Sequence, residues 1–214
     1  MLQYRTIYPT TLEFLKELML LPYLQDFFLA GGTALALQIG HRISVDIDMF
    51  TLDDFDTETL ISKLNKQFAL INITEKQNAL SFDMACYGRE NDTVEVDLIT
   101  YSYPLIKPIL TIDKIRLLSV EDIIAMKLSA VAGRGSKKDF YDIFYLLKSY
   151  RLEQMFSLFE KKFPDTNKFH ILKSLTYFDD ADLEPNPQTI EKIEWERVKI
   201  KIIGETNSFI SRLC

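Results

Sequence analysis

The segment FLAGGTALALQIGHRISVDIDMF, residues 28–50, constrains the fold of this chain more than any other stretch of its sequence. Gly31 and Gly32 form a turn, after which Thr33 can cap a short helix that Gly40 ends. A glycine turn that opens a helix presents bare backbone N–H groups at the helix N-terminus, where phosphate binds. The pattern therefore predicts a tight turn that is also a candidate phosphate site.

Two aspartates follow this turn in a segment that alternates charged and apolar residues. Residues 44–50 are predicted to form a strand, and alternate residues of a strand share one face, so Asp46 and Asp48 are expected to point the same way. Neighbouring carboxylates repel each other, and burying them unpaired is costly. A shared proton or a divalent cation resolves the repulsion. The simpler interpretation is that the acids lie on an exposed strand face. The adjacent glycine turn, however, favours a metal site.

The rest of the chain predicts an α+β fold with a mixed sheet, because hairpin-like strands precede a largely helical second half. We expect a core domain over residues 1–110 and a helical region over 111–214. Ser119 and Asp122 form a capping box, and a turn is expected at residues 88–92. The predicted strands cover residues 27–30, 44–50, 70–75, 79–87 and 93–101, and the predicted helices cover 10–21, 33–39, 57–68, 119–131, 138–149 and much of 152–214.

A third acidic candidate lies on the strand predicted for residues 93–101. Asp97 and Glu95 share one face of this strand, and three carboxylates converge if the strand lies beside Asp46 and Asp48. Oxygen-only ligation favours Mg²⁺ or Mn²⁺. Zinc has little support, because the two histidines of the chain form no ligand pair.

Composition limits the remaining classes of function. A net charge of −6 argues against broad, non-specific nucleic-acid binding, which needs a basic surface, although a local basic patch remains compatible with it. Two cysteines, Cys86 and Cys214, are too few for a disulfide framework. With no signal peptide and no membrane span predicted, we expect a cytoplasmic protein.

The residues described above resemble the first motif of the DNA polymerase β-like nucleotidyltransferases. Ala30-Gly31-Gly32 is followed after thirteen residues by Asp46-Ile47-Asp48-Met49, and the longer string GGTALALQIGHRISVDIDMF looks like the AbiEii/AbiGii toxin branch. The second half, AMKLSAVAGRGSKKDFYDIFYLLK, is similar to the Lys-bearing helix of that branch, which is followed by Arg and then by Lys-Asp-h-Tyr-Asp, where h is apolar.

The resemblance implies a site for a nucleoside triphosphate and for Mg²⁺ or Mn²⁺. Asp46 and Asp48 would bind the metal, and Asp97 would complete the site and act as general base, with Glu95 as the alternative third acid. The residues that would bind the triphosphate or line the site are Gly31, Gly32, Thr33, Lys127, Arg134, Lys137, Asp139 and Asp142. From the residues alone, the basic ones could equally form a solvated helix end, and the two later aspartates could be surface charges or partners for Lys127 or Arg134.

The implied function is transfer of a nucleoside monophosphate from an NTP to an acceptor hydroxyl on RNA, such as tRNA, or on protein. The resemblance also implies the toxin of a bacterial toxin–antitoxin or abortive-infection system, with a cognate antitoxin as partner. Two alternatives stay open: a non-catalytic nucleotide- or partner-binding protein of the same fold, and a small-molecule nucleotidyltransferase of the antibiotic-modifying kind.

Overall fold

The computed structural model describes residues 1–85 and 93–213, and it divides the chain into two compact units. The first unit comprises Met1–Tyr103 and Ile109–Leu118, and the second comprises Pro104–Pro108 and Ser119–Cys214. The two cysteines and the turn predicted at residues 88–92 lie outside the described residues.

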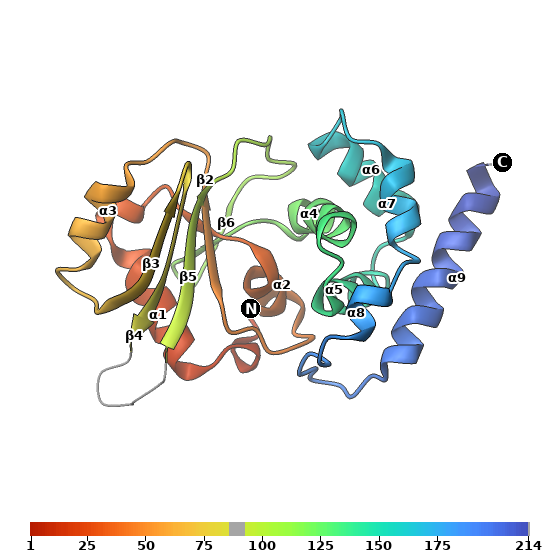
Figure 1. Cartoon of the computed structure of the whole chain (residues 1–214), viewed down its shortest axis with the longest axis horizontal. Coiled ribbons are helices and arrows are strands. Elements are labelled where there is room, and N and C mark those ends of the chain that lie inside the picture. Colours follow the sequence, from red (N-terminus) through yellow and green to blue (C-terminus); the bar gives the residue numbers. More distant parts are fainter. Residues whose placement is uncertain (86–92, 214) are drawn as a thin grey trace. The chain divides into compact units, whose positions relative to one another are not determined.

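A mixed sheet forms the centre of the first unit. Within the described residues it has seven strands, in the spatial order β3-β4-β5-β2-β1-β7-β6 (Figure 1). The pairs β2–β5 and β1–β7 are parallel and the other neighbours are antiparallel, so the predicted α+β fold with a mixed sheet is confirmed. The strands are β1 (Phe28–Leu29), β2 (Ile47–Thr51), β3 (Leu70–Lys76), β4 (Ala79–Ala85), β5 (Thr93–Thr100), β6 (Leu110–Ile112) and β7 (Ile115–Leu117).

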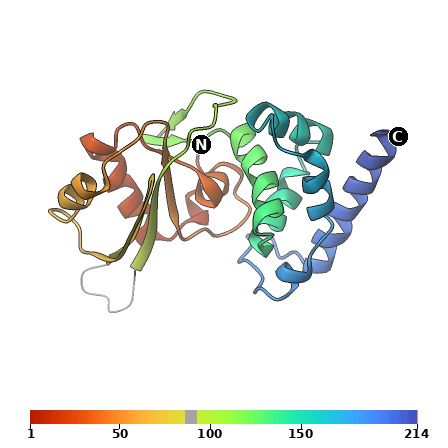
Figure 2. The same ribbon diagram turned by 45° about the horizontal axis from the view of Figure 1, so that its top comes forward.

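The two faces of the sheet differ in burial. On β4 and β5 the residues of one face are buried, among them Leu80, Phe82, Val96 and Leu98, while those of the other face are half-buried or exposed. Figures 1 and 2 show α1 and α3 on one side of the strands and α2 on the other. The helical segments of this unit are η1 (Tyr4–Thr6), α1 (Pro9–Leu20), η2 (Pro22–Leu24), α2 (Gly31–Ile39) and α3 (Thr57–Leu64).

Helix α2 begins two residues earlier than predicted. Gly31 has a φ of +62° and is itself the first helical residue, so the N-cap is Ala30 and the predicted cap at Thr33 is wrong. Thr33 lies inside the helix, and its hydroxyl is bonded to the Asp46 carbonyl and the Ser44 hydroxyl. Gly40 ends the helix with a φ of +72°, as predicted.

The hairpin of β6 and β7 was not predicted, although it completes one edge of the sheet. Its strands are only three residues long, and Asp113 and Lys114 between them both have positive φ, of +51° and +66°. Two consecutive residues with positive φ form the turn type that suits a two-residue hairpin. Because neither is glycine, the sequence gives no turn signal here.

The second unit is helical. Helix α4 packs against α5, α6 and α7, and the long helix α9 packs against α5 and α6 (Figure 2). The predicted cap of α4 is confirmed, because the Ser119 hydroxyl accepts a hydrogen bond of 3.0 Å from the Asp122 N–H. The helices are α4 (Val120–Gly133), α5 (Lys137–Leu146), α6 (Leu152–Lys162), α7 (Lys168–Ser174), α8 (Asp179–Asp182) and α9 (Trp195–Leu213).

Candidate nucleotide and metal site

Two of the predicted acids lie side by side on neighbouring parallel strands. In the register of β2 and β5, Asp48 is the direct partner of Asp97. Directly opposed residues of paired strands share a face, and their Cβ atoms lie close together. Glu95, two residues earlier on β5, is exposed and is opposed to Asp83 of β4. The register therefore brings Asp97 rather than Glu95 next to Asp48.

Asp97 carries a buried oxygen that the protein does not satisfy. Its Oδ1 atom is buried and has no hydrogen-bond partner among residues 1–85 and 93–213. A buried oxygen of this kind normally accepts at least one hydrogen bond, because removing it from water without a partner costs free energy. An acid kept at this cost, with its strand neighbour also an acid, is a candidate ligand for a cation.

Asp48 lies against the first residue of α2. A Cβ atom placed on Gly31 would lie 2.1 Å from Asp48 Oδ2, so no residue with a side chain fits there without moving the carboxylate. The first N–H groups of a helix have no acceptor within the helix. The glycine thus lets the acidic strand and the open end of α2 approach each other closely.

Asp46 is placed differently from the prediction. Strand β2 begins at Ile47, so Asp46 precedes the strand, and the strand predicted over residues 44–50 is three residues too long at its start. The segment before β2 is held from inside by buried side chains. Arg42 Nη1 donates hydrogen bonds to Ile43 O and Ser44 Oγ, and Ser44 in turn is bonded to Thr33, which contacts the Asp46 carbonyl.

Arg42 and Ser44 hold the segment before β2, and neither was among the predicted site residues. Arg42 is buried, and a Cβ atom on Gly32 would lie 2.5 Å from its guanidinium, so Gly32 leaves room for this cation as Gly31 does for Asp48. The Arg-x-Ser-x-Asp spacing ahead of the strand is the signal that could have indicated this network.

That Asp46 joins Asp48 and Asp97 in one metal site stays a prediction. Across residues 1–85 and 93–213 there is no group of three or more Asp, Glu, His or Cys side chains that could hold a metal ion. Two neighbouring carboxylates nevertheless suit Mg²⁺, which is commonly bound through one or two carboxylates together with waters and substrate phosphates.

The basic residues predicted to line the site form an ion-pair cluster within the helical unit. Lys127 Nζ lies 2.7 Å from Asp139 Oδ1 and 2.6 Å from Asp142 Oδ2, and Arg134 Nε lies 2.7 Å from Asp139 Oδ2. Both carboxylates are fully buried, so they orient Lys127 and Arg134 and are not surface charges. Burial raises the pKa of Asp139, but the charges of Lys127 and Arg134 outweigh it and leave that pKa below its usual value.

Lys137 is also buried, and its ammonium group contacts residues that follow α8 in the chain. Its ammonium group donates to the Glu184 carbonyl and lies 5.3 Å from the centre of the Trp195 ring. That Lys127, Arg134, Lys137, Asp139 and Asp142 line a nucleotide site stays a prediction.

Comparison with solved structures identifies the fold class of this protein. Over 97% of its length the chain is similar to the crystal structure of JHP933 from Helicobacter pylori, of which it covers 94%, with a TM-score of 0.60 and 18% identity. It is also similar to MenT4, the nucleotidyltransferase toxin Rv2826c of Mycobacterium tuberculosis H37Rv, with a TM-score of 0.53 and 15% identity over 90% of this chain and 82% of that one. The chain thus has the nucleotidyltransferase fold.

The family follows from the sequence comparison. The family described as nucleotidyl transferase AbiEii toxin, type IV TA system, matches residues 13–209, and the chain belongs to this family. A relative, the uncharacterized protein aq_aa25 of Aquifex aeolicus (strain VF5), is 34% identical over 199 residues, which are 87% of this chain and 93% of that protein. The family expected from the glycine turn and the alternating aspartates is therefore confirmed.

None of the helices in the described part of the chain combines the length and the apolar character that crossing a bilayer requires.

Proposed function

We propose that this protein transfers a nucleoside monophosphate from an NTP to a hydroxyl group of an RNA or protein acceptor and releases pyrophosphate. The observation that carries the proposal is the pair Asp48–Asp97, in which Asp97 keeps a buried oxygen without a hydrogen-bond partner. Membership of a nucleotidyltransferase toxin family supports the same reaction.

The chain's own groups have separate tasks in this reaction. The N–H groups at Gly31 and Gly32, at the open end of α2, hold phosphate oxygens of the NTP. The acceptor hydroxyl oxygen forms a bond to the α-phosphorus, and the bond from that phosphorus to the oxygen bridging to the β-phosphate breaks. Asp97 accepts the hydroxyl proton, and pyrophosphate leaves with the bonding electron pair.

A divalent cation fits the same carboxylates. Asp48 and Asp97 would hold Mg²⁺ or Mn²⁺ together with phosphate oxygens of the NTP, and Asp46, at the entrance to β2, would be the third acid. When bound, the cation would neutralise charge that develops on the transferring phosphoryl group. Without it, the two carboxylates would repel both each other and the triphosphate.

In the cell, we propose that the protein is the toxin of a toxin–antitoxin pair, that it acts in the cytoplasm and that a cognate antitoxin counteracts it. The description of its family as part of a type IV system supports this role. Expression of the wild-type chain should then arrest growth, and expression of Asp97→Asn should not.

The reaction can be tested with each of the four NTPs labelled at the α-phosphate, with Mg²⁺ or Mn²⁺, and with total RNA or cell protein as acceptor. We expect labelled RNA or labelled protein, together with released pyrophosphate. Asp48→Asn and Asp97→Asn should lower the rate by at least about 100-fold, since a lost charge contact at the phosphoryl group costs several kcal/mol.

Asp83→Asn is the matched control, because Asp83 is a half-buried acid of β4 that binds Asn72 through a 2.6 Å hydrogen bond. Its rate should stay within about twofold of the wild type. Transfer that persists in Asp97→Asn would refute the mechanism. Cation-dependent NTP binding without transfer to any acceptor would indicate a binding protein, and transfer to small hydroxylated antibiotics alone would indicate the small-molecule enzyme.

A further inference from the structure

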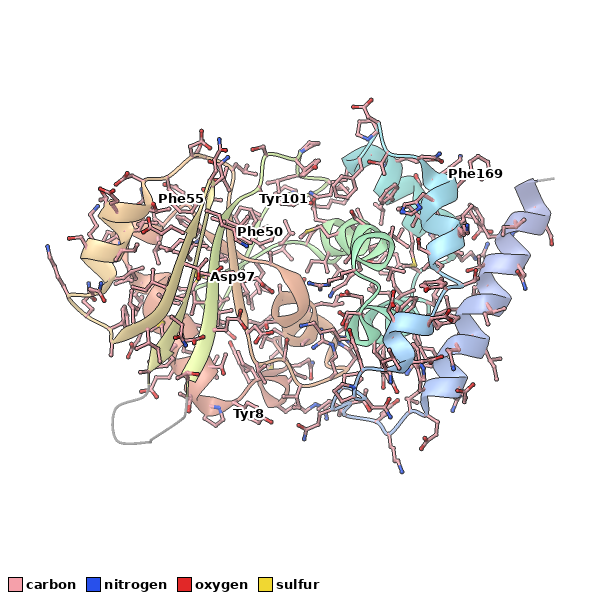
Figure 3. The ribbon with its side chains drawn as sticks, in the orientation of Figure 1. Tyr8, Phe50, Phe55, Asp97, Tyr101 and Phe169 are labelled. Atoms are coloured by element: carbon pink, nitrogen blue, oxygen red, sulfur yellow. The ribbon has the colours of Figure 1, made fainter. Side chains whose placement is uncertain are left out.

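Three aromatic rings pack in a row, through tilted ring contacts, where the parallel strands β2 and β5 end. The ring centres of Phe50 and Tyr101 are 5.0 Å apart with an interplanar angle of 31°, and those of Tyr101 and Tyr103 are 5.0 Å apart with an angle of 49°. Figure 3 shows Phe50 and Tyr101 next to each other, further along the strands than Asp97. We refer to Phe50, Tyr101 and Tyr103 as the aromatic stack.

The aromatic stack lies on the same face of the sheet as the paired carboxylates. Phe50 follows Asp48 by two residues on β2, so both side chains share a face. The Tyr101 N–H donates a 2.7 Å hydrogen bond to Thr51 O, which extends the strand pairing, so Tyr101 continues the face of Asp97. Four residues of strand separate Asp97 from Tyr101, or about 13 Å, a distance that one or two linked nucleotides span.

Burial decreases from the inside of the stack to its outside. Phe50 is 8% exposed and Tyr103 is 48% exposed. The outer ring is therefore accessible and is supported from below by two further rings. Nucleobases stack on exposed aromatic rings of this kind. The stacking is not specific for one base, because every base has a π-face. It also needs no basic surface, which agrees with the acidic composition of the chain.

We infer that the aromatic stack is a binding platform for a nucleobase, with Tyr103 as the ring that touches the base. The inference rests on the proposed function, because the stack is assigned to a nucleobase on the ground that it lies near the proposed catalytic acids Asp48 and Asp97. The base belongs either to the NTP or to a nucleotide of an RNA acceptor, and binding experiments distinguish these two sources.

The test compares Tyr103→Leu, which removes the ring, with Tyr103→Phe, which keeps it. Tyr8→Leu is the matched control, since Tyr8 is equally exposed at 48% and lies at the opposite end of the strands in Figure 3. The probes are 2-aminopurine riboside triphosphate with Mg²⁺ and a ten-nucleotide single-stranded RNA that contains 2-aminopurine. The fluorescence of this base is quenched when it stacks on an aromatic ring.

We expect Tyr103→Leu to bind at least one probe about tenfold more weakly than the wild type and to lose its quenching. Tyr103→Phe and Tyr8→Leu should behave as the wild type, and thermal unfolding should show that all variants are folded. A weakened triphosphate probe assigns the platform to the NTP base, and a weakened RNA probe assigns it to an acceptor base.

The inference is overturned if Tyr103→Leu binds both probes with wild-type affinity and quenching, which would make the stack a purely structural cover of the sheet end. It is also overturned if the wild type binds neither probe. Because the measurement requires no turnover, its result is separate from the transfer assay. Failure of transfer with intact, Tyr103-dependent binding would refute the reaction and leave the platform.

Discussion

The two units of this protein differ in how the buried oxygens of their aspartates are satisfied. In the sheet unit, Asp97 has a buried oxygen that accepts no hydrogen bond. In the helical unit, Asp122 is fully buried and accepts hydrogen bonds from the N–H groups of Ile106 and Lys107 at 2.8 and 3.1 Å. It also binds the Ser119 hydroxyl and the Lys162 ammonium, both at 2.7 Å.

The difference separates an acid whose partners all come from the protein from an acid that keeps an unsatisfied oxygen. A buried charge with a full set of partners contributes to specifying the structure, and removing one partner leaves an uncompensated charge. An acid with an unsatisfied buried oxygen contributes little to stability, and the missing partner can be a substrate or an ion. Replacing the acids or their partners should therefore change the free energy of unfolding much more in the helical unit than in the sheet unit.

The largest effect is expected when the partner of Asp122 is removed. In Lys162→Met the carboxylate of Asp122 stays buried without its cation, so the free energy of unfolding should fall by about 3–5 kcal/mol. Urea unfolding measures this change. The neighbouring exposed Lys161→Met is the control and should change stability by less than about 0.5 kcal/mol. A loss below about 1 kcal/mol in Lys162→Met would refute a structural role for the pair.

Low pH should lower the free energy of unfolding through the buried carboxylates of the helical unit. Burial raises the pKa of Asp122, but the hydrogen bonds from Ile106, Lys162 and Ser119 outweigh it, so the pKa lies below its usual value. The pKa of Asp139 is lowered in the same sense. A lowered pKa in the folded state stabilises the fold above the ordinary Asp value of about 3.9, and this contribution is lost as the pH falls through the folded-state pKa.

We therefore expect the free energy of unfolding to be level near neutral pH and to fall as the pH drops below about 4. Unfolding in urea at a series of pH values from 6 to 2 measures it. Asp122→Asn should be less stable than the wild type at pH 6 and should lose less on acidification. An equal loss in both proteins would contradict the assignment.

A smaller effect is expected at the exposed end of the Lys127 cluster. The Arg134 side chain is 58% exposed, and Asp139 keeps Lys127 when the arginine is replaced. Arg134→Gln should therefore cost about 1 kcal/mol, since partly exposed ion pairs contribute little. Lys127→Met, measured in the same way, should cost several times more because it leaves two buried carboxylates without their shared cation.

The smallest effect is expected at Asp97. In Asp97→Asn the buried site loses a charge without losing a hydrogen bond at Oδ1, so the free energy of unfolding should stay within about 0.5 kcal/mol of the wild type or rise. The same variant should be inactive in the transfer assay. A destabilisation above about 2 kcal/mol would show that Asp97 is a structural acid after all.

Local sequence signals predicted much of the fold. The positive φ of Gly40 and the hydroxyl cap of Ser119 act over a few residues, and both were read correctly from the sequence. Predictions failed where longer-range contacts decide the outcome. Strand β2 starts at Ile47, and the residues before it are held by side-chain contacts with Arg42 and Thr33, which the alternation of the sequence does not indicate.

For the candidate site, the sequence indicated which acids to consider, but it did not predict which of them lie opposite each other on paired strands. The pairing of Asp48 with Asp97 joins segments 49 residues apart, and Lys162 reaches Asp122 over 40 residues. Alternation fixes the face on which a side chain lies, whereas partner and burial depend on the assembled fold. Which acids are satisfied and which are not therefore emerges only from the structure.

The path of the chain has a consequence for any attempt to dissect the protein. The polypeptide leaves the sheet unit after Tyr103, returns at Ile109 and leaves again after Leu118. A fragment cut after residue 118 would carry Ile106 and Lys107 without the carboxylate that binds their amides, and a fragment cut after residue 103 would lack β7, the parallel neighbour of β1. Neither half can be obtained whole by a single cleavage, so the two units have to be made as one polypeptide.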